Sequence, residues 1–153
     1  MSMKPVQAVD SWLDADEERA WRTFRRMMVV VQARTAQDLA ELGLSEADYE
    51  VLSTLSEAPD RTSTLHAQAT KMAWSRSRLS RHASRMESRG LVERRPDPDD
   101  GRGCLLVLTP HGFEILAEAA PAHVVSVRRH VIDRLRRDDL ANLERIADQI
   151  ISE

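Results

Sequence analysis

Hydrophobic residues recur at steps of three and four along most of the chain, and short polar, turn-forming segments interrupt them. This spacing is typical of amphipathic helices. Helices are expected over residues 12–42, 45–57, 64–72, 75–90, 110–135 and 138–151. Gly43 and Pro59-Asp60 end the first two helices and Gly90 ends the fourth, and Pro121 should kink the fifth.

Two apolar, β-compatible runs, 91–95 (LVERR) and 104–108 (CLLVL), flank the turn-rich segment PDPDDGRG. A strand, a turn-rich loop and a strand predict a β-hairpin. The hairpin follows two helices, 64–72 and 75–90, that are joined by a tight turn at 73–75. We therefore expect a mainly α fold of the α+β type, a helix-turn-helix with a two-stranded wing.

The helix expected over 75–90 carries one apolar stripe, Leu79, Ala83 and Met86, and its remaining surface is rich in serine and arginine. Its arginines are Arg76, Arg78, Arg81, Arg85 and Arg89, and Glu87 is its one acid. Guanidinium groups pair with phosphates and guanine edges, so this surface suits the major groove of duplex DNA. The alternative is a solvated helix face, which is what most charged runs are.

The charge distribution favours the nucleic-acid interpretation although the whole chain carries a net charge of −3. Residues 71–95 hold eight Lys/Arg and two acids, a charge of +6, so the remainder carries −9. One basic face on an acidic protein suits a polyanionic partner. The length of 153 residues fits a single domain, residues 1–153, and the low aromatic content of 4% predicts an aliphatic core.

Other classes of protein find little support in the sequence. No run of about 18 apolar residues and no apolar signal core is present, so we expect no membrane partner and a cytoplasmic location. Phosphate-binding loops and nucleophile motifs are absent, so we expect a non-enzyme with no cofactor and no metal. Cys104 is interpreted as a small core residue, and His82 as a further candidate DNA contact. A winged-helix module that binds protein or RNA remains the alternative.

The chain resembles the MarR family of winged-helix transcription regulators. The resemblance rests on MAWSRSRLSRHASRMESRGLVERR (72–95), on DGRGCLLVLTPHG (100–112), and on AAPAHVVSVRRHVIDRL (119–135). The second segment has the family's wing signature, formed by Asp100, Arg102, Leu108, Thr109 and Gly112. One departure is Gln68, within Ala67-Gln68-Ala69, where the family usually has Glu-Leu-Ala.

The resemblance implies a homodimer whose helices 12–42 and 110–153 form the interface, with residues 45–109 as the DNA-binding module. It implies recognition helices in successive major grooves and wings in the flanking minor grooves. Many members are repressors that a small molecule, often an anionic aromatic, releases from DNA. A twofold dimer would read a pseudo-palindrome with half-sites roughly 34–36 Å apart.

The candidate site residues divide by role. Base reading is assigned to Arg76, Ser77, Arg78 and Arg81, phosphate binding to Ser75, Ser80 and Arg85, and wing contacts to Arg95 and Arg102, with Asp100 supporting Arg102. Aromatic walls and a cation would suit an anionic effector. Trp21, Arg25, Met28 and Tyr49 are therefore candidate ligand-binding residues, although Trp21, Met28 and Tyr49 could equally be core or dimer residues.

Overall fold

The computed structural model describes residues 12–152, which belong to two compact units that meet between Ala33 and Arg34. Helix α1 (Ala15–Ala40) begins in the first unit and ends in the second. It starts after Asp14, whose carboxylate accepts the backbone N–H groups of Asp16 and Glu17. The long first helix is confirmed, with slightly shorter bounds than the pattern predicted.

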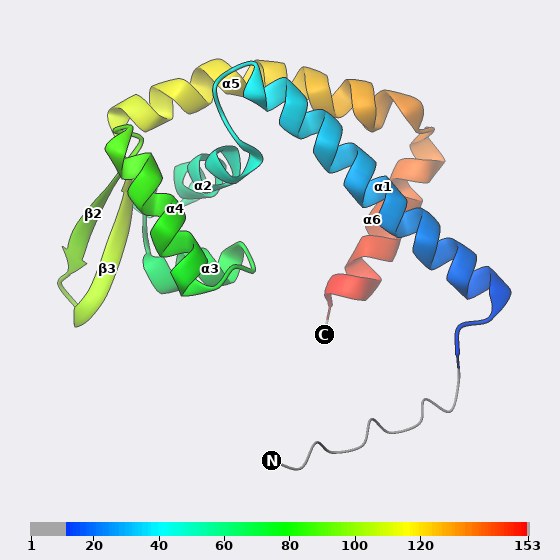
Figure 1. Cartoon of the computed structure of the whole chain (residues 1–153), viewed down its shortest axis with the longest axis horizontal. Helices are drawn as coiled ribbons and strands as arrows, with labels where there is room; N and C mark the ends of the chain where they lie inside the picture. The colour runs from blue at the N-terminus through cyan, green and yellow to red at the C-terminus, as the bar shows by residue number, and fades with distance from the viewer. Residues whose placement is uncertain (1–11, 153) are drawn as a thin grey trace, which may run out of the picture. The chain divides into compact units, whose positions relative to one another are not determined.

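The second unit contains the other expected helices and the hairpin (Figure 1). Its elements are α2 (Glu46–Glu57), η1 (Pro59–Arg61), β1 (Thr62–Thr64), α3 (Leu65–Lys71), α4 (Arg76–Ser88), β2 (Val92–Asp97), β3 (Asp100–Leu108), α5 (Pro110–His130), η2 (Ile132–Arg134) and α6 (Arg137–Ile151). Helix α5 continues through Pro121 but ends at His130 rather than Leu135, because the chain there turns into the short helix η2.

Local capping explains where several of these helices begin. Ser45 and Asp48 form a reciprocal capping box at α2, and the Ser75 hydroxyl accepts the Arg78 N–H at α4. Thr109 caps α5, where its hydroxyl accepts the Gly112 N–H at 2.9 Å. A Cβ at Gly112 would lie 2.0 Å from the Leu91 carbonyl oxygen, so this position requires glycine for close packing.

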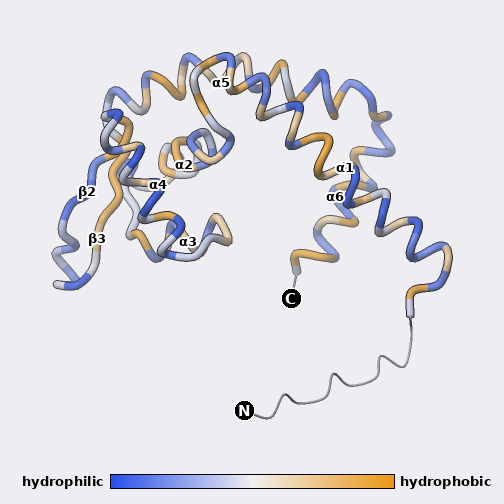
Figure 2. Tube along the Cα trace, in the orientation of Figure 1, coloured by the Kyte–Doolittle hydropathy of each residue, from blue (hydrophilic) through white to orange (hydrophobic). Residues whose placement is uncertain are grey.

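The three strands form one antiparallel sheet in the order β1-β3-β2. In the wing, Val92 pairs with Leu108 and Arg95 with Leu105, and the register becomes irregular after Pro96. Figure 2 shows β3 as more hydrophobic than β2, because β3 supplies Leu106 and Leu108 to the core and β2 supplies Val92. Strand β1 was not expected, and it pairs Thr62 with Val107 on the other side of β3.

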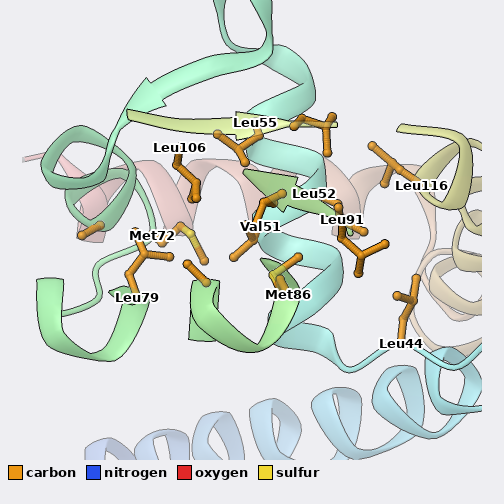
Figure 3. Packing of buried hydrophobic residues seen from close by; sticks show 14 of the residues in the cluster. Leu44, Val51, Leu52, Leu55, Met72, Leu79, Met86, Leu91, Leu106 and Leu116 are labelled. Carbon is orange, nitrogen blue, oxygen red and sulfur yellow. The ribbon is translucent and has the colours of Figure 1, made fainter. Parts of the chain in front are cut away.

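A single aliphatic core joins α2, α3, α4, the sheet and the first half of α5 (Figure 3). From α4, the predicted stripe Leu79, Ala83 and Met86 is fully buried in it. Gln68 is also buried, and its amide nitrogen donates to Thr54 Oγ1 and to the Met72 sulfur. The departure from the family pattern is thus accommodated by polar partners. We call residues 44–119, which supply this core, the winged module.

The terminal helices differ from this module because their large apolar side chains remain exposed. In the first unit, the described part of α1 exposes Trp21, Phe24, Met27, Met28 and Val29. Helix α6 has no buried residue and exposes Leu143, Ile146, Ile150 and Ile151. None of the helices within residues 12–152 is long and apolar enough to cross a membrane.

Candidate nucleic-acid interface

The outer face of α4 is the surface turned away from the core, and it carries most of the predicted contacts. Its exposed residues are Ser75, Arg76, Ser77, Arg78, Arg81, Ser84 and Arg85. Ser80 is only partly exposed. The Ser75 hydroxyl oxygen is used as the helix cap, but its O–H remains a donor suited to a phosphate.

Three of the predicted arginines have no partner for their guanidinium groups among the described residues. Arg76 and Arg81 lie on the outer face of α4, and Arg102 lies on β3 near the wing tip. Each therefore presents a full positive charge and a complete set of N–H donors to solvent. Such groups can form charge-assisted hydrogen bonds to phosphates without first breaking an intramolecular pair.

Two other arginines on this face are held by neighbouring rings. The Arg78 guanidinium lies 3.8 Å from the centre of the Trp74 ring, a cation–π contact. Arg85 Nη2 lies 3.1 Å from His82 Nδ1. Trp74, in the turn between α3 and α4, packs against the core.

Two residues expected on the outer face lie elsewhere. Arg89 is the C-cap of α4, and its guanidinium donates to Asp48 Oδ2 at 2.8 Å and to the Gly43 carbonyl at 2.9 Å. His82 is buried, with only 8% of its surface exposed, so the prediction that it contacts DNA is wrong. Both residues contact Asp48 on α2, which lies far away in the sequence.

Asp48 is a buried carboxylate that stays ionised because its partners outweigh its burial. Burial alone raises the pKa of Asp48, but hydrogen bonds from the Ser45 N–H and the Arg89 guanidinium bring it below the ordinary value. His82 Nε2 lies 2.9 Å from Asp48 Oδ1. Burial lowers the pKa of His82 and outweighs the opposing influence of Asp48.

The wing residues have more modest roles than their charges suggest. Arg95 forms an exposed ion pair with Glu93, Nε to Oε1 at 3.0 Å, and the Arg95 hydrogen bond lowers the pKa of the Glu93 carboxyl. Asp100 Oδ1 accepts the backbone N–H of Arg102 at 3.1 Å. Asp100 therefore shapes the loop before Arg102 and forms no ion pair with its guanidinium.

Sequence reasoning missed Arg94, which connects strand β2 of the wing to α4. Its guanidinium donates to the Ser80 carbonyl and to Ser84 Oγ, the latter at 2.9 Å, and its backbone N–H donates to Glu87 Oε2 at 2.9 Å. The one acid of α4 is thus used to hold the wing. Alternation along β2 offered a signal, because Arg94 is half-buried between exposed Glu93 and Arg95.

Between the wing and the helix-turn-helix lies an open hollow of about 490 Å³. Arg76 from α4, His66 from α3 and Arg102 from the wing line it, together with Asp97 and Asp100. The guanidinium groups of Arg76 on α4 and Arg102 on the wing therefore line one concave surface. This surface could receive a nucleic-acid backbone only where the carboxylates of Asp97 and Asp100 face away from it.

The predicted effector residues fall in both units. Trp21, Arg25 and Met28 are exposed on the first unit's part of α1, whereas Tyr49 lies in the second unit. Tyr49 packs on His123, with ring centres 4.2 Å apart, and burial raises the pKa of its hydroxyl. A ligand site shared by these four residues therefore stays a prediction.

Metal or thiol chemistry finds no support in the part of the chain that the structure describes. No group of three or more His, Cys, Asp or Glu side chains there could hold a metal ion. Cys104 is partly buried on β3, and its thiol donates weakly to the Leu105 carbonyl at 3.5 Å.

A helix-turn-helix with a hairpin wing and an arginine-rich outer helix face defines a winged-helix protein of the transcription-regulator class. A sequence model described as MarR family matches residues 42–103. The chain is 32% identical over 103 residues to the transcriptional regulator HosA of Escherichia coli O111:H-, covering 65% of this chain and 73% of HosA. The chain belongs to the MarR family.

Two solved structures from Streptomyces coelicolor share the fold over nearly the whole chain. AbsC, a MarR family transcriptional regulator, is 39% identical with a TM-score of 0.86, covering 94% of this chain and 99% of AbsC. Sco3205, a MarR family regulator solved in complex with DNA, is 33% identical with a TM-score of 0.88, covering 92% of this chain and 89% of that one.

Proposed function

We propose that this protein is a homodimeric regulator that binds a pseudo-palindromic site in duplex DNA through the outer face of α4 and the wing. The observation that carries the proposal is the set of three unpaired arginines, Arg76, Arg81 and Arg102, on one surface. The structure of similar Sco3205 in complex with DNA supports it. Arg76 and Arg81 would read base edges, and Arg102 would enter the minor groove.

The dimer follows from the exposed apolar side chains of the terminal helices. A solvent-exposed set such as Ile146, Ile150 and Ile151 on α6 marks an interaction surface. Covering it with a second copy places two α4 helices in one particle. The two helices would then read half-sites roughly 34–36 Å apart.

Selection of bound fragments from random duplex DNA tests the proposal, followed by fluorescence anisotropy on the selected duplex. We expect an inverted repeat and an affinity that falls by about 10³–10⁵ between 50 and 200 mM salt, as for six to ten phosphate contacts. Arg81→Ala should weaken binding by about 1–3 kcal/mol. Arg145→Ala, an equal charge change on α6, should have little effect. Binding without site preference, or preference for RNA or protein, would refute the proposal.

The regulator would act as a repressor that a small anionic aromatic ligand releases from DNA. Arg25 with Trp21 and Met28, all on the first unit's part of α1, is one candidate site. A hollow of about 330 Å³ between the end of α1 and α5 is the other, with Arg129 and His123 in its lining. Both combine a cation with apolar or aromatic surface.

A melting-temperature screen of aromatic carboxylic acids would identify the ligand, since binding to the native state alone stabilises it. Arg25→Ala and Arg129→Ala then decide between the two sites, because only one should abolish the shift. A reporter gene behind the selected duplex should be repressed, and the ligand should restore its expression. Activation by the protein would contradict the repressor role.

A further inference from the structure

A chain of polar contacts connects the core to the outer face of α4: Asp48 contacts His82, and His82 contacts Arg85. Asp48 on α2 and His82 on α4 are 5% and 8% exposed. His82 Nε2 lies 2.9 Å from Asp48 Oδ1, although its N–H does not point along that line. The contact is therefore a charge–dipole interaction that places the carboxylate beside the imidazole.

The other ring nitrogen of His82 faces the solvent side of the helix. Its Nδ1 lies 3.1 Å from Nη2 of Arg85, one turn along α4. A guanidinium group has only N–H donors, so Nδ1 must be the acceptor. The imidazole proton then belongs on Nε2, the nitrogen beside the Asp48 carboxylate. Both neighbours thus select the same tautomer.

We propose that His82, itself oriented by Asp48, is a positioning residue that holds the Arg85 guanidinium ready to bind a DNA phosphate. This inference rests on the proposed function, because it assigns a purpose to a contact within the DNA-binding surface. The bond to His82 uses one N–H of Arg85. The remaining donors of the guanidinium stay available for phosphate oxygens.

Arg85 differs in this respect from its neighbours on the same face. Arg76 and Arg81 have no partner among the described residues, so they lose side-chain entropy when they bind. Arg85 has lost part of that freedom already in the free protein. Preorganisation of this kind improves affinity without adding a contact to the complex.

The charges around the imidazole keep Nδ1 available as an acceptor. Asp48 faces it from α2, and Arg85 and Arg78 face it from α4. The Trp74 ring meets it edge-on, with ring centres 5.8 Å apart. Burial lowers the pKa of His82 despite the nearby carboxylate, so the ring is neutral at pH 7.

A double-mutant cycle on the selected duplex tests the proposal. His82→Gln places an amide nitrogen near the position of Nε2 but offers no acceptor at the position of Nδ1. We expect it to weaken binding by about 2- to 13-fold, the effect of immobilising one side chain. The same change in an Arg85→Ala background should leave affinity nearly unchanged, because the positioned group is gone. In an Arg81→Ala background, His82→Gln should again cause its full loss of affinity.

An equal loss in the Arg85→Ala and Arg81→Ala backgrounds would overturn the proposal, since it would show a general structural effect. His82→Asn is a second variant, and its amide oxygen can replace Nδ1. It should retain more affinity than His82→Gln, and the opposite order would also count against positioning. Melting temperatures of all variants control for folding.

Side-chain nitrogen relaxation of the free protein separates this inference from the proposed function, because it requires no DNA. Arg85 should be ordered in the unsubstituted protein and mobile in His82→Gln, whereas Arg81 should be mobile in both. A mobile Arg85 in the unsubstituted protein would refute the positioning role. Absence of any preferred duplex would refute the proposed function and leave this measurement valid.

Discussion

The winged module and the terminal helices differ in how far their apolar side chains are buried. In the module, residues from four helices and two strands enclose one another, and Val51, Leu52, Leu55, Leu79 and Leu106 are completely buried. On α6 no residue is buried, and Ile150 is 68% exposed. The module therefore buries its own apolar side chains, whereas those of the terminal helices remain exposed, as the proposed dimer requires.

This difference assigns separate tasks to the two regions. A rigid core lets the module present arginines at fixed positions, which base reading requires. Exposed apolar helix faces allow a second copy to set the distance between two modules. Affinity for one half-site would then depend on the module, and selection of a paired site on the terminal helices.

Removing a core side chain should produce the largest effect, a loss of unfolding free energy, and it tests whether the module is stabilised by its own core. Leu79→Ala deletes a fully buried side chain on the inner face of α4, so we expect a loss of about 2–5 kcal/mol in unfolding free energy. Val124→Ala, at a position that is 56% exposed, should change it by less than about 0.5 kcal/mol. Urea denaturation measures both. A small effect of Leu79→Ala would mean that the module is not closed by its own packing.

Introducing a charge on α6 should have the next largest effect, and it tests whether the terminal helices form the dimer interface. Ile146→Glu places a carboxylate on the proposed interface and should weaken dimerisation by about 2–4 kcal/mol, the range of an interface hot spot. The module should still melt cooperatively, because no core contact is lost. Gln149→Glu, on another side of α6, is the control. Sedimentation equilibrium that shows an unchanged dimer would remove the basis for this interface.

The pattern along the chain was sufficient for elements whose signal is local. Ser45, Ser75 and Thr109 mark helix starts by their own caps, and Leu79, Ala83 and Met86 mark the buried stripe. Strand β1 has only three residues and exists because β3 offers it an edge. Such pairing leaves no periodicity that a sequence could reveal.

The sequence predicted which residues form the site, but it did not predict which of their side chains pair with one another. The outer arginines of α4 follow from helical spacing, yet spacing placed Arg89 among them. Its contact with Asp48 spans 41 positions, and Arg94 reaches back to Ser84 across 10. Which arginine is free and which is paired depends on tertiary neighbours, so local sequence could not separate Arg102 from Arg95.

Substitution of the two wing arginines, Arg102 and Arg95, should reduce DNA affinity to different extents. Arg102→Ala removes an unpaired cation and should weaken duplex binding by about 1–3 kcal/mol, mostly at flanking A/T positions. Arg95→Ala should have a smaller effect, because Arg95 must give up its pair with Glu93 before binding. Anisotropy titrations on duplexes with A/T or G/C flanks compare them. Equal losses, or no flank preference, would rule out a minor-groove role for Arg102.

Mild acid should have the smallest effect and should act through two histidines, the buried His82 in the winged module and the partly buried His123 further along α5. Burial lowers the pKa of both His82 and His123, so the folded protein favours their neutral forms. As the pH falls below about 6.5, the unfolded chain binds protons that the native state does not, and stability decreases. The melting temperature should therefore drop between pH 7.5 and pH 5.5, and less so in His82→Gln. The exposed His66→Gln should keep the full decrease.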